Sequence, residues 1–227
     1  GQIKVTQPHC RSVAGGAGGD GAPLFSPYET SGIDLIENAI AIEQATVDAI
    51  HKSNFDERGI NGDPTRQQTK SGQNGWCKRL AKQQADVLRS RGHLGTSAKY
   101  GGREKGVKSM HGLLSLETEG YDEAAVERQE GDQGEHTDQS VEALQRMADV
   151  DKPSSTMYAI QDGTRLRIKP LDGDWVTLWL KPGDLLVFRG DVCHHGMGYA
   201  GKNYRVHAYL YPPGYKPGPS SLHPCGQ

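Results

Sequence analysis

The chain has 227 residues and a mass of 24.7 kDa, a size that suits a single catalytic domain. Its formal net charge of −2 argues against a disordered chain, and its 30 glycines predict a fold with many turns. The sequence has no apolar run of the ~18–20 residues that a membrane span needs, and it does not open on a signal segment. We therefore expect a protein that is neither exported nor held in a membrane.

The chain has four cysteines, which lie far apart at Cys10, Cys77, Cys193 and Cys225. None of them forms the CxxC pattern of a zinc ribbon or a thioredoxin-like site. We therefore expect four reduced thiols in a protein of the cytoplasm or of another reducing compartment.

Residues 1–30 are expected to form a flexible N-terminal arm. The glycine-rich stretch from Ala14 to Gly21 contains a formal GxGxxG pattern. A dinucleotide site needs a strand before this pattern and a helix at its end, but here Pro23 follows almost at once. A flexible segment therefore explains these glycines better than a cofactor loop does.

Two helices are expected in the region 31–110, which would support the core. The first begins with a capping box at Ser31, and its apolar residues keep helical spacing to about Lys52. The second is amphipathic and runs from Trp76 to Arg91. Both apolar stripes are interpreted as packing faces.

After residue 110 the pattern changes to short strands that are separated by turn signals such as Asp-Gly and Pro-Gly. Many short strands preceded by two helices predict a mainly β fold, an antiparallel barrel or sandwich backed by helices. Its core would span 111–211, and a tail would follow at 212–227. The expected strands are His111–Glu117, a segment that ends near His136, Ser154–Ile160, Arg165–Lys169, Trp175–Leu180, Leu185–Phe188, Val192–His195 and Tyr204–Tyr211.

Charge is distributed unevenly along the chain. Residues 66–111 carry 11 Lys/Arg against 2 Asp/Glu, and residues 112–151 carry 2 against 12. A basic block can be a phosphate-binding face, but it can equally be a solvated helix that faces its acidic neighbour. A nucleic-acid-binding module using this basic segment is therefore an alternative, and it is not the favoured one.

A His-x-Asp pair and a later histidine form the main candidate for chemistry. On an extended backbone His136 and Asp138 project to the same side, so that an imidazole and a carboxylate can meet one metal ion. A third ligand is available at His194 or His195. Two imidazoles and one carboxylate, with open positions, form the facial triad of non-haem iron(II) oxygenases.

Arg205 lies on an alternating strand whose inward side would also carry His207 and Tyr209. A guanidinium inside a small barrel is costly unless an anion meets it. A dicarboxylate cosubstrate would supply such an anion through a bidentate pair.

These residues, with the segment Leu180–Leu210, resemble the signature of the 2-oxoglutarate/iron(II)-dependent oxygenase family. The resemblance covers about residues 111–211 and implies a double-stranded β-helix, or jelly roll, packed against the N-terminal helices. It implies that Fe(II) is bound by His136, Asp138 and His194, and that the distal carboxylate of 2-oxoglutarate is bound by Arg205. His194 is preferred to His195 because the metal histidine of the family commonly sits two residues before a glycine, here Gly196.

The activity that the resemblance implies is hydroxylation of a C–H bond, with dioxygen as cosubstrate and release of succinate and CO2. Many members of the family place a Ser or Thr two residues after the arginine, where this chain has His207. Tyr158, Thr156 or Tyr199 are the candidates for the missing hydroxyl. The substrate is not predicted: it is a small molecule, a peptide side chain or a nucleobase. A cupin-like metal enzyme or metal binder that does not use 2-oxoglutarate is the other alternative.

Overall fold

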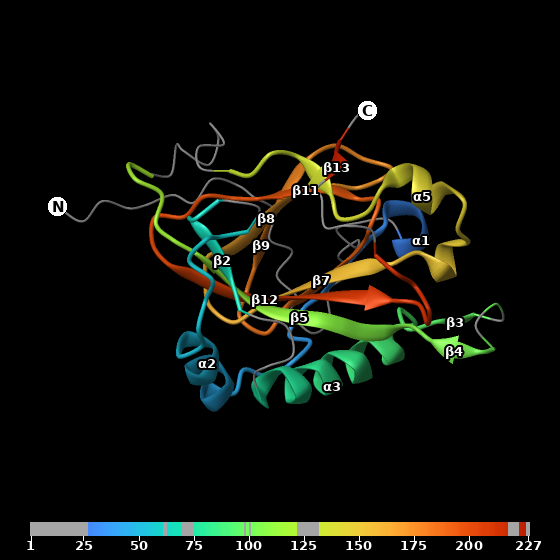
Figure 1. The fold of residues 1–227 in the computed structure, drawn as a ribbon, viewed down its shortest axis with the longest axis horizontal. Helices are drawn as coiled ribbons and strands as arrows, with labels where there is room; N and C mark the ends of the chain where they lie inside the picture. The colour runs from blue at the N-terminus through green and yellow to red at the C-terminus, as the bar shows by residue number, and fades with distance from the viewer. Residues whose placement is uncertain are drawn as a thin grey trace, which may run out of the picture.

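The computed structural model describes residues 27–60, 63–69, 75–97, 99, 101–121, 132–217 and 223–225. The glycine-rich stretch Ala14–Gly21 and most of the expected N-terminal arm lie outside these residues. Two antiparallel sheets face each other and enclose the interior of the molecule (Figure 1). This arrangement is the expected double-stranded β-helix.

The larger sheet has six strands in the order β1-β10-β7-β12-β5-β2. Its central strands alternate in register, so that every second residue points toward the other sheet. The strands are β1 (Ile33–Ile36), β2 (Arg66–Gln68), β5 (Gly106–Ser115), β7 (Ser154–Ala159), β10 (Leu185–Arg189) and β12 (Asn203–Tyr211).

The smaller sheet has five strands in the order β13-β6-β11-β8-β9. A separate pair, β3 (Thr96–Ser97) and β4 (Arg103–Glu104), forms a two-stranded hairpin. The strands of the smaller sheet are β6 (His136–Thr137), β8 (Thr164–Lys169), β9 (Val176–Leu180), β11 (Cys193–Gly196) and β13 (His223–Pro224).

Two helices, α2 (Gln44–His51) and α3 (Gly75–Ser90), cover the outer face of the larger sheet (Figure 1). Their apolar residues form one core with the outward side chains of the sheet, and a second core fills the space between the sheets. The short helices are α1 (Tyr28–Ser31), α5 (Val141–Gln145) and the 3-10 turn η2 (Asp149–Asp151). Among the described residues, no helix is long and apolar enough to cross a membrane.

The helix expected from Ser31 to Lys52 is wrong. The segment instead forms β1, which pairs with β10, and only its last part is helical, in α2. Ile33 packs between the sheets while Ile36 packs under the helices, so their spacing reflects two cores rather than one helical stripe. Ser31 ends α1 and does not cap a following helix.

The second expected helix is confirmed as α3, and the strands expected after residue 110 have counterparts, except that β6 begins at His136, where a strand was expected to end. The sequence did not reveal β1, β2, β3, β4 and β13. Each of these has four residues or fewer, too short for an alternating pattern to stand out.

A disulfide joins Cys193 on β11 to Cys225, just after β13. The expectation of four reduced thiols is therefore wrong, although Cys77 keeps a buried thiol that donates to the Met110 carbonyl. Because disulfides are rare in reducing compartments, the cysteine argument for such a compartment no longer holds. The sequence did not indicate this disulfide, because Cys193 and Cys225 meet only when β13 adds to the edge of the smaller sheet.

Candidate metal centre and anion pocket

His136, Asp138 and His194 converge between the two sheets. One ligand atom of each lies within 4.8 Å of the ligand atoms of the other two. His136 and His194 are directly opposite each other in the β6–β11 pair, and their ring centroids are 4.5 Å apart. The His194 Nε2 lies 3.7 Å from the Asp138 Oδ1. This donor set and spacing suit a divalent metal ion such as Fe(II).

Backbone carbonyls orient both imidazoles. The Nδ1 of His136 bonds to the Gly134 oxygen at 2.7 Å, and the Nδ1 of His194 bonds to the Val192 oxygen at 3.1 Å. With Nδ1 used as a donor, Nε2 is left as an unprotonated lone pair in each ring. Outer hydrogen bonds of this kind fix the tautomer that a metal requires.

The Asp138 carboxylate is held by the larger sheet. Its Oδ2 accepts a hydrogen bond from Ser155 on β7 and lies 3.8 Å from the His207 Nε2 on β12. Phe188 on β10 packs edge-on against the His194 ring at 4.7 Å. The site is therefore built by both sheets, with an apolar wall behind one imidazole.

Charge states at the site favour metal binding at neutral pH. Burial lowers the pKa of His136 to about 4, and the neighbouring His194 adds to this effect. Burial acts to raise the pKa of Asp138, but His194, His207 and the Ser155 hydroxyl outweigh it, so this pKa falls below its ordinary value. Neutral imidazoles and an ionised carboxylate are the forms that coordinate metals.

His195 points away from this cluster. Its Nδ1 lies 3.5 Å from the Asp132 Oδ2, and its ring packs against Trp175 at 5.5 Å. Adjacent strand residues face opposite sides, which is why only His194 joins His136 and Asp138. Gly196 leaves room for two long side chains, since a Cβ there would lie 2.7 Å from both the Arg66 Nη1 and the Gln133 Oε1, which would have to move.

Arg205 is buried on the inner side of β12, with 4% of its surface exposed. Its Nη1 donates to the Ser115 hydroxyl at 3.0 Å, but its Nε has no hydrogen-bond partner. Arg205 and His207 lie on the same face of β12, two residues apart, which separates them by about 7 Å along the strand. Because His207 is the one beside Asp138, Arg205 lies farther from the metal ligands. A buried guanidinium with an unpaired donor is suited to an anion.

A second buried guanidinium lies near the first. Burial, and next the charge of Arg205, lower the pKa of Arg66 on β2. The Arg66 Nε lies 3.1 Å from the Asp63 carboxylate, and its Nη1 donates to the Met197 carbonyl at 3.2 Å. The ring of Tyr199 lies 5.6 Å from the Arg205 guanidinium. Arg205 thus has a second positive charge nearby and an aromatic ring beside it.

Thr156 and Tyr158 do not assist Arg205, which corrects that expectation. Both point from β7 toward the helices: Thr156 donates to Gln84 on α3 at 3.1 Å, and the Tyr158 hydroxyl donates to the Ile40 carbonyl. They alternate with Ser155, which faces the inside. The Tyr199 hydroxyl is bonded to the Arg165 backbone instead.

The hydroxyl beside Arg205 comes from Ser115, which the sequence reasoning missed. Ser115 pairs with Asn203 on β12 and with Arg66 on β2, so strand pairing alone brings these residues together. The one available signal was the inward alternation of the expected strand beginning at His111. Ser155, which bonds Asp138, was missed for the same reason.

Basic side chains of the segment 66–111 are paired with carboxylates in the described structure. Arg79 lies 3.3 Å from Glu43, and Arg89 lies 3.2 Å from Glu104. Such pairs neutralise part of the basic block, which weakens the case for a nucleic-acid surface there. Further pairs join Lys82 to Asp86, and Arg89 to Asp86.

Comparisons with known proteins bear on the fold. No protein-family model matches the chain, and no curated protein matches it. Among solved structures, the chain is similar to HygX from Streptomyces hygroscopicus with nickel and 2-oxoglutarate bound. The identity is 11%, the TM-score 0.57, and 84% of this chain and 86% of that one are covered.

Two further structures show the same likeness. A prolyl hydroxylase from Trichoplax adhaerens, in complex with a hypoxia inducible factor peptide fragment, is 13% identical with a TM-score of 0.55 and covers 81% of this chain and 85% of its own. The epimerase SnoN, in complex with Fe3+, alpha ketoglutarate and nogalamycin RO, is 13% identical with a TM-score of 0.54 and covers 87% and 91%. The fold is therefore that of 2-oxoglutarate/iron(II)-dependent oxygenases.

Proposed function

We propose that the protein is an Fe(II)- and 2-oxoglutarate-dependent oxygenase that hydroxylates a C–H bond and releases succinate and CO2. The observation that carries the proposal is the convergence of His136, Asp138 and His194, with the unpaired Arg205 Nε further along the same interior. The similar folds of HygX, SnoN and a prolyl hydroxylase support it. The cupin-like alternative gives no role to Arg205, whose inward position therefore argues against it.

In this proposal His136, Asp138 and His194 hold the metal, and a bound iron supplies the oxidising chemistry of the reaction. Gly134 and Val192 keep both imidazoles in the tautomer that presents Nε2. Ser155 holds one oxygen of Asp138 and leaves the other toward His194. These three side chains would together hold the ion between the two sheets.

Arg205 would bind the distal carboxylate of 2-oxoglutarate. Its Nε donor is free for that purpose, while the Ser115 hydroxyl holds its Nη1 in place. The burial of Arg205 strengthens such a charge-assisted pair because water competes less there. Arg66 would add a second positive charge nearby and help to attract the dianion.

The test is anaerobic addition of Fe(II) and 2-oxoglutarate, followed by visible absorption. The wild-type protein should develop the charge-transfer band of an iron–2-oxoglutarate chelate, whereas His136→Ala should not. His51→Ala is the matched control, because it removes an exposed imidazole from α2 and should keep the band. Circular dichroism checks that each variant is folded, and a wild-type protein without the band would contradict the proposal.

A further inference from the structure

The inner face of β12 is more open than its outer face. Val206, Ala208 and Leu210 point toward the helices and are 0% exposed. His207, Tyr209 and Tyr211 point between the sheets, yet each of them is partly exposed. Solvent therefore reaches the inward side chains at this end of β12, and we call this side the opening.

A row of aromatic rings lines this opening and starts at the candidate metal centre. His207, which lies 3.8 Å from Asp138, contacts the ring of Tyr209 at 4.7 Å. Tyr209 stacks on Tyr211 with centroids 5.4 Å apart and planes 19° apart, and Tyr211 contacts Tyr215 at 5.2 Å. We name Tyr209, Tyr211 and Tyr215 the tyrosine row.

The tyrosine row is anchored beside the metal ligands. The Tyr215 hydroxyl donates to the Gln139 Oε1 at 2.6 Å, and Gln139 directly follows Asp138. The Asp138 carboxylate is the first cause of the raised pKa of Tyr209. A flat body that packs on these rings would therefore reach the metal centre with one end.

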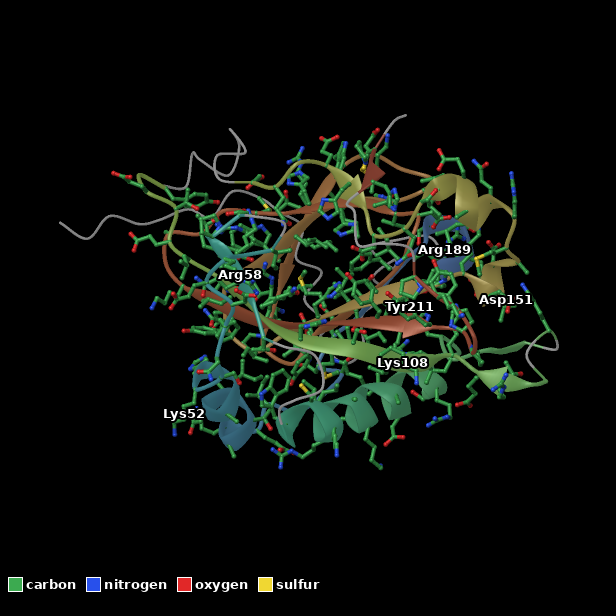
Figure 2. All side chains as sticks on the ribbon, in the orientation of Figure 1. Lys52, Arg58, Lys108, Asp151, Arg189 and Tyr211 are labelled. Atoms are coloured by element: carbon green, nitrogen blue, oxygen red, sulfur yellow. A yellow bond between two sulfur atoms is a disulfide. The ribbon has the colours of Figure 1, made fainter. Side chains whose placement is uncertain are left out.

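A β-bulge brings one ammonium group to the same face. His207 pairs with His111, but Tyr209 pairs with Lys108, so β5 carries one extra residue between these pairs. Strict alternation from His111 would turn Ser109 inward and Lys108 outward. The extra residue of the bulge reverses this and turns Lys108 inward. The Lys108 side chain lies back over Gly106, which is opposite Tyr211. Figure 2 shows Lys108 on β5 and Tyr211 on the adjacent β12.

Among the described residues, the inward side chains of β5 and β12 that carry a charge are cations, and the nearby anion is the Asp138 carboxylate, 3.8 Å from the His207 Nε2. Across the inward positions of β5 and β12 that the structure describes, Arg205 and Lys108 are the charged side chains. Arg205 lies on the far side of His207 from the opening, which leaves Lys108 to meet a group that enters along the tyrosine row. Aromatic rings next to a single exposed cation fit a ligand that has a ring and a negative charge.

We propose that the substrate of this site is a ring-bearing organic anion. Its ring packs on Tyr209 and Tyr211, and its anionic group pairs with Lys108. This inference rests on the proposed function, because it takes the opening beside His136, Asp138 and His194 as the side from which the substrate enters.

The test uses calorimetric titration of the metal-free protein with 3-phenylpropionate, 3-phenylpropionamide and hexanoate. We expect 3-phenylpropionate to bind most tightly of the three. Lys108→Met should weaken its binding about fivefold, to the level of the amide, since a partly exposed ion pair is modest in strength. Tyr211→Leu should weaken both ring compounds about fivefold and leave hexanoate unchanged.

Two controls keep the test decisive. Lys52→Met removes an exposed lysine at the end of α2, away from Lys108 in Figure 2, and should change nothing. Arg205→Ala reports on carboxylates that enter the deeper pocket: loss of binding in Arg205→Ala with no change in Lys108→Met would overturn the proposal. Equal binding of the acid and the amide would also overturn it. The titrations contain no iron, so their result does not depend on whether the protein forms the iron–2-oxoglutarate chelate that tests the proposed function.

Discussion

At the scale of single residues, the two nitrogens of each ligand imidazole have different roles. Nδ1 of His136 and of His194 bonds to a carbonyl two residues earlier in the chain, which is a local contact of an extended strand. The spacing of two residues between each histidine and its carbonyl therefore fixes both the tautomer and the position of the imidazole. Few side chains have to be recruited from elsewhere to make both Nε2 atoms available to a metal.

Replacing Arg205 by Ala should raise the apparent KM for 2-oxoglutarate by about 10–100-fold, because a hydrogen bond to a charged group contributes about 1.5–3 kcal/mol. The affinity for Fe(II) should change much less, since Arg205 is not a ligand in the proposal. Steady-state kinetics and an iron titration measure the two effects. Ser115→Ala, which removes only the hydroxyl that holds Arg205, should give a smaller increase in KM, and equal losses of both affinities in Arg205→Ala would contradict the assigned role.

Lys105 gives a prediction about pH. Burial lowers its pKa from 10.5 to about 8, so the unfolded chain binds more protons than the folded chain between these values. The free energy of unfolding should therefore rise with pH across this interval, and below pH 8 the cost of burying the charge is fully present. Lys105→Met should be more stable than wild type at pH 7.5 by about 2–3 kcal/mol.

Urea denaturation at pH 7.5 and pH 9.5 measures this effect, and the advantage of Lys105→Met should shrink at the higher pH. The upper limit of pH 9.5 keeps the measurement below the ordinary pKa of tyrosine. An advantage that stays the same at both values would show that packing, and not the ammonium charge, causes it.

At the scale of elements, the spacing of apolar residues predicted an element correctly where its apolar side chains enter a single core. It failed where one element sends apolar side chains into both cores. β12 alternates because one face meets the helices and the other meets the interior, and this pattern was legible in the sequence. β1 sends Ile33 and Ile36 into different cores, so its spacing imitates a helix. The bulge in β5 was hidden because no glycine marks it.

Ser109 occupies the bulge with φ of 47°, in the left-handed region that residues with a Cβ seldom adopt. Ser109→Gly should raise the free energy of unfolding by about 0.5–1 kcal/mol, because glycine has no Cβ to strain. Ser109→Val should lower it by about 1–2 kcal/mol, since branching at Cβ worsens the clash. Chemical denaturation measures both, and a destabilised Ser109→Gly would mean that the hydroxyl has a contact that outweighs the strain.

At the scale of the whole molecule, the sequence contained the ligands of the site but not their surroundings. His136 and Asp138 share a face over a spacing of two, a local rule, and the position of Gly196 favoured His194 through the family resemblance. Ser115, Arg66 and Ser155 reach the site only through pairing between distant strands. The disulfide was missed for the same reason, because it depends on how the smaller sheet ends.

Loss of the disulfide should lower the free energy of unfolding by about 3–4 kcal/mol, the chain-entropy value for closing a loop of this size. Its two cysteines are separated by 32 positions in the sequence. Urea denaturation with and without a reductant measures the effect in the wild type. The double variant Cys193→Ser/Cys225→Ser should show the lower stability and should not respond to the reductant, and a wild type that ignores the reductant would contradict the expectation.

The covalent ring between Cys193 and Cys225 encloses all of β12, and with it Arg205 and the tyrosine row. A protease that cuts once inside this ring would leave two fragments that still migrate as one species on a gel without reductant. The nicked protein would also keep β12 tethered to β11, so reassembly of the pocket after a cut would be an intramolecular event. A single cut in this part of the backbone would therefore not separate β12 from the rest of the site as long as the disulfide is intact.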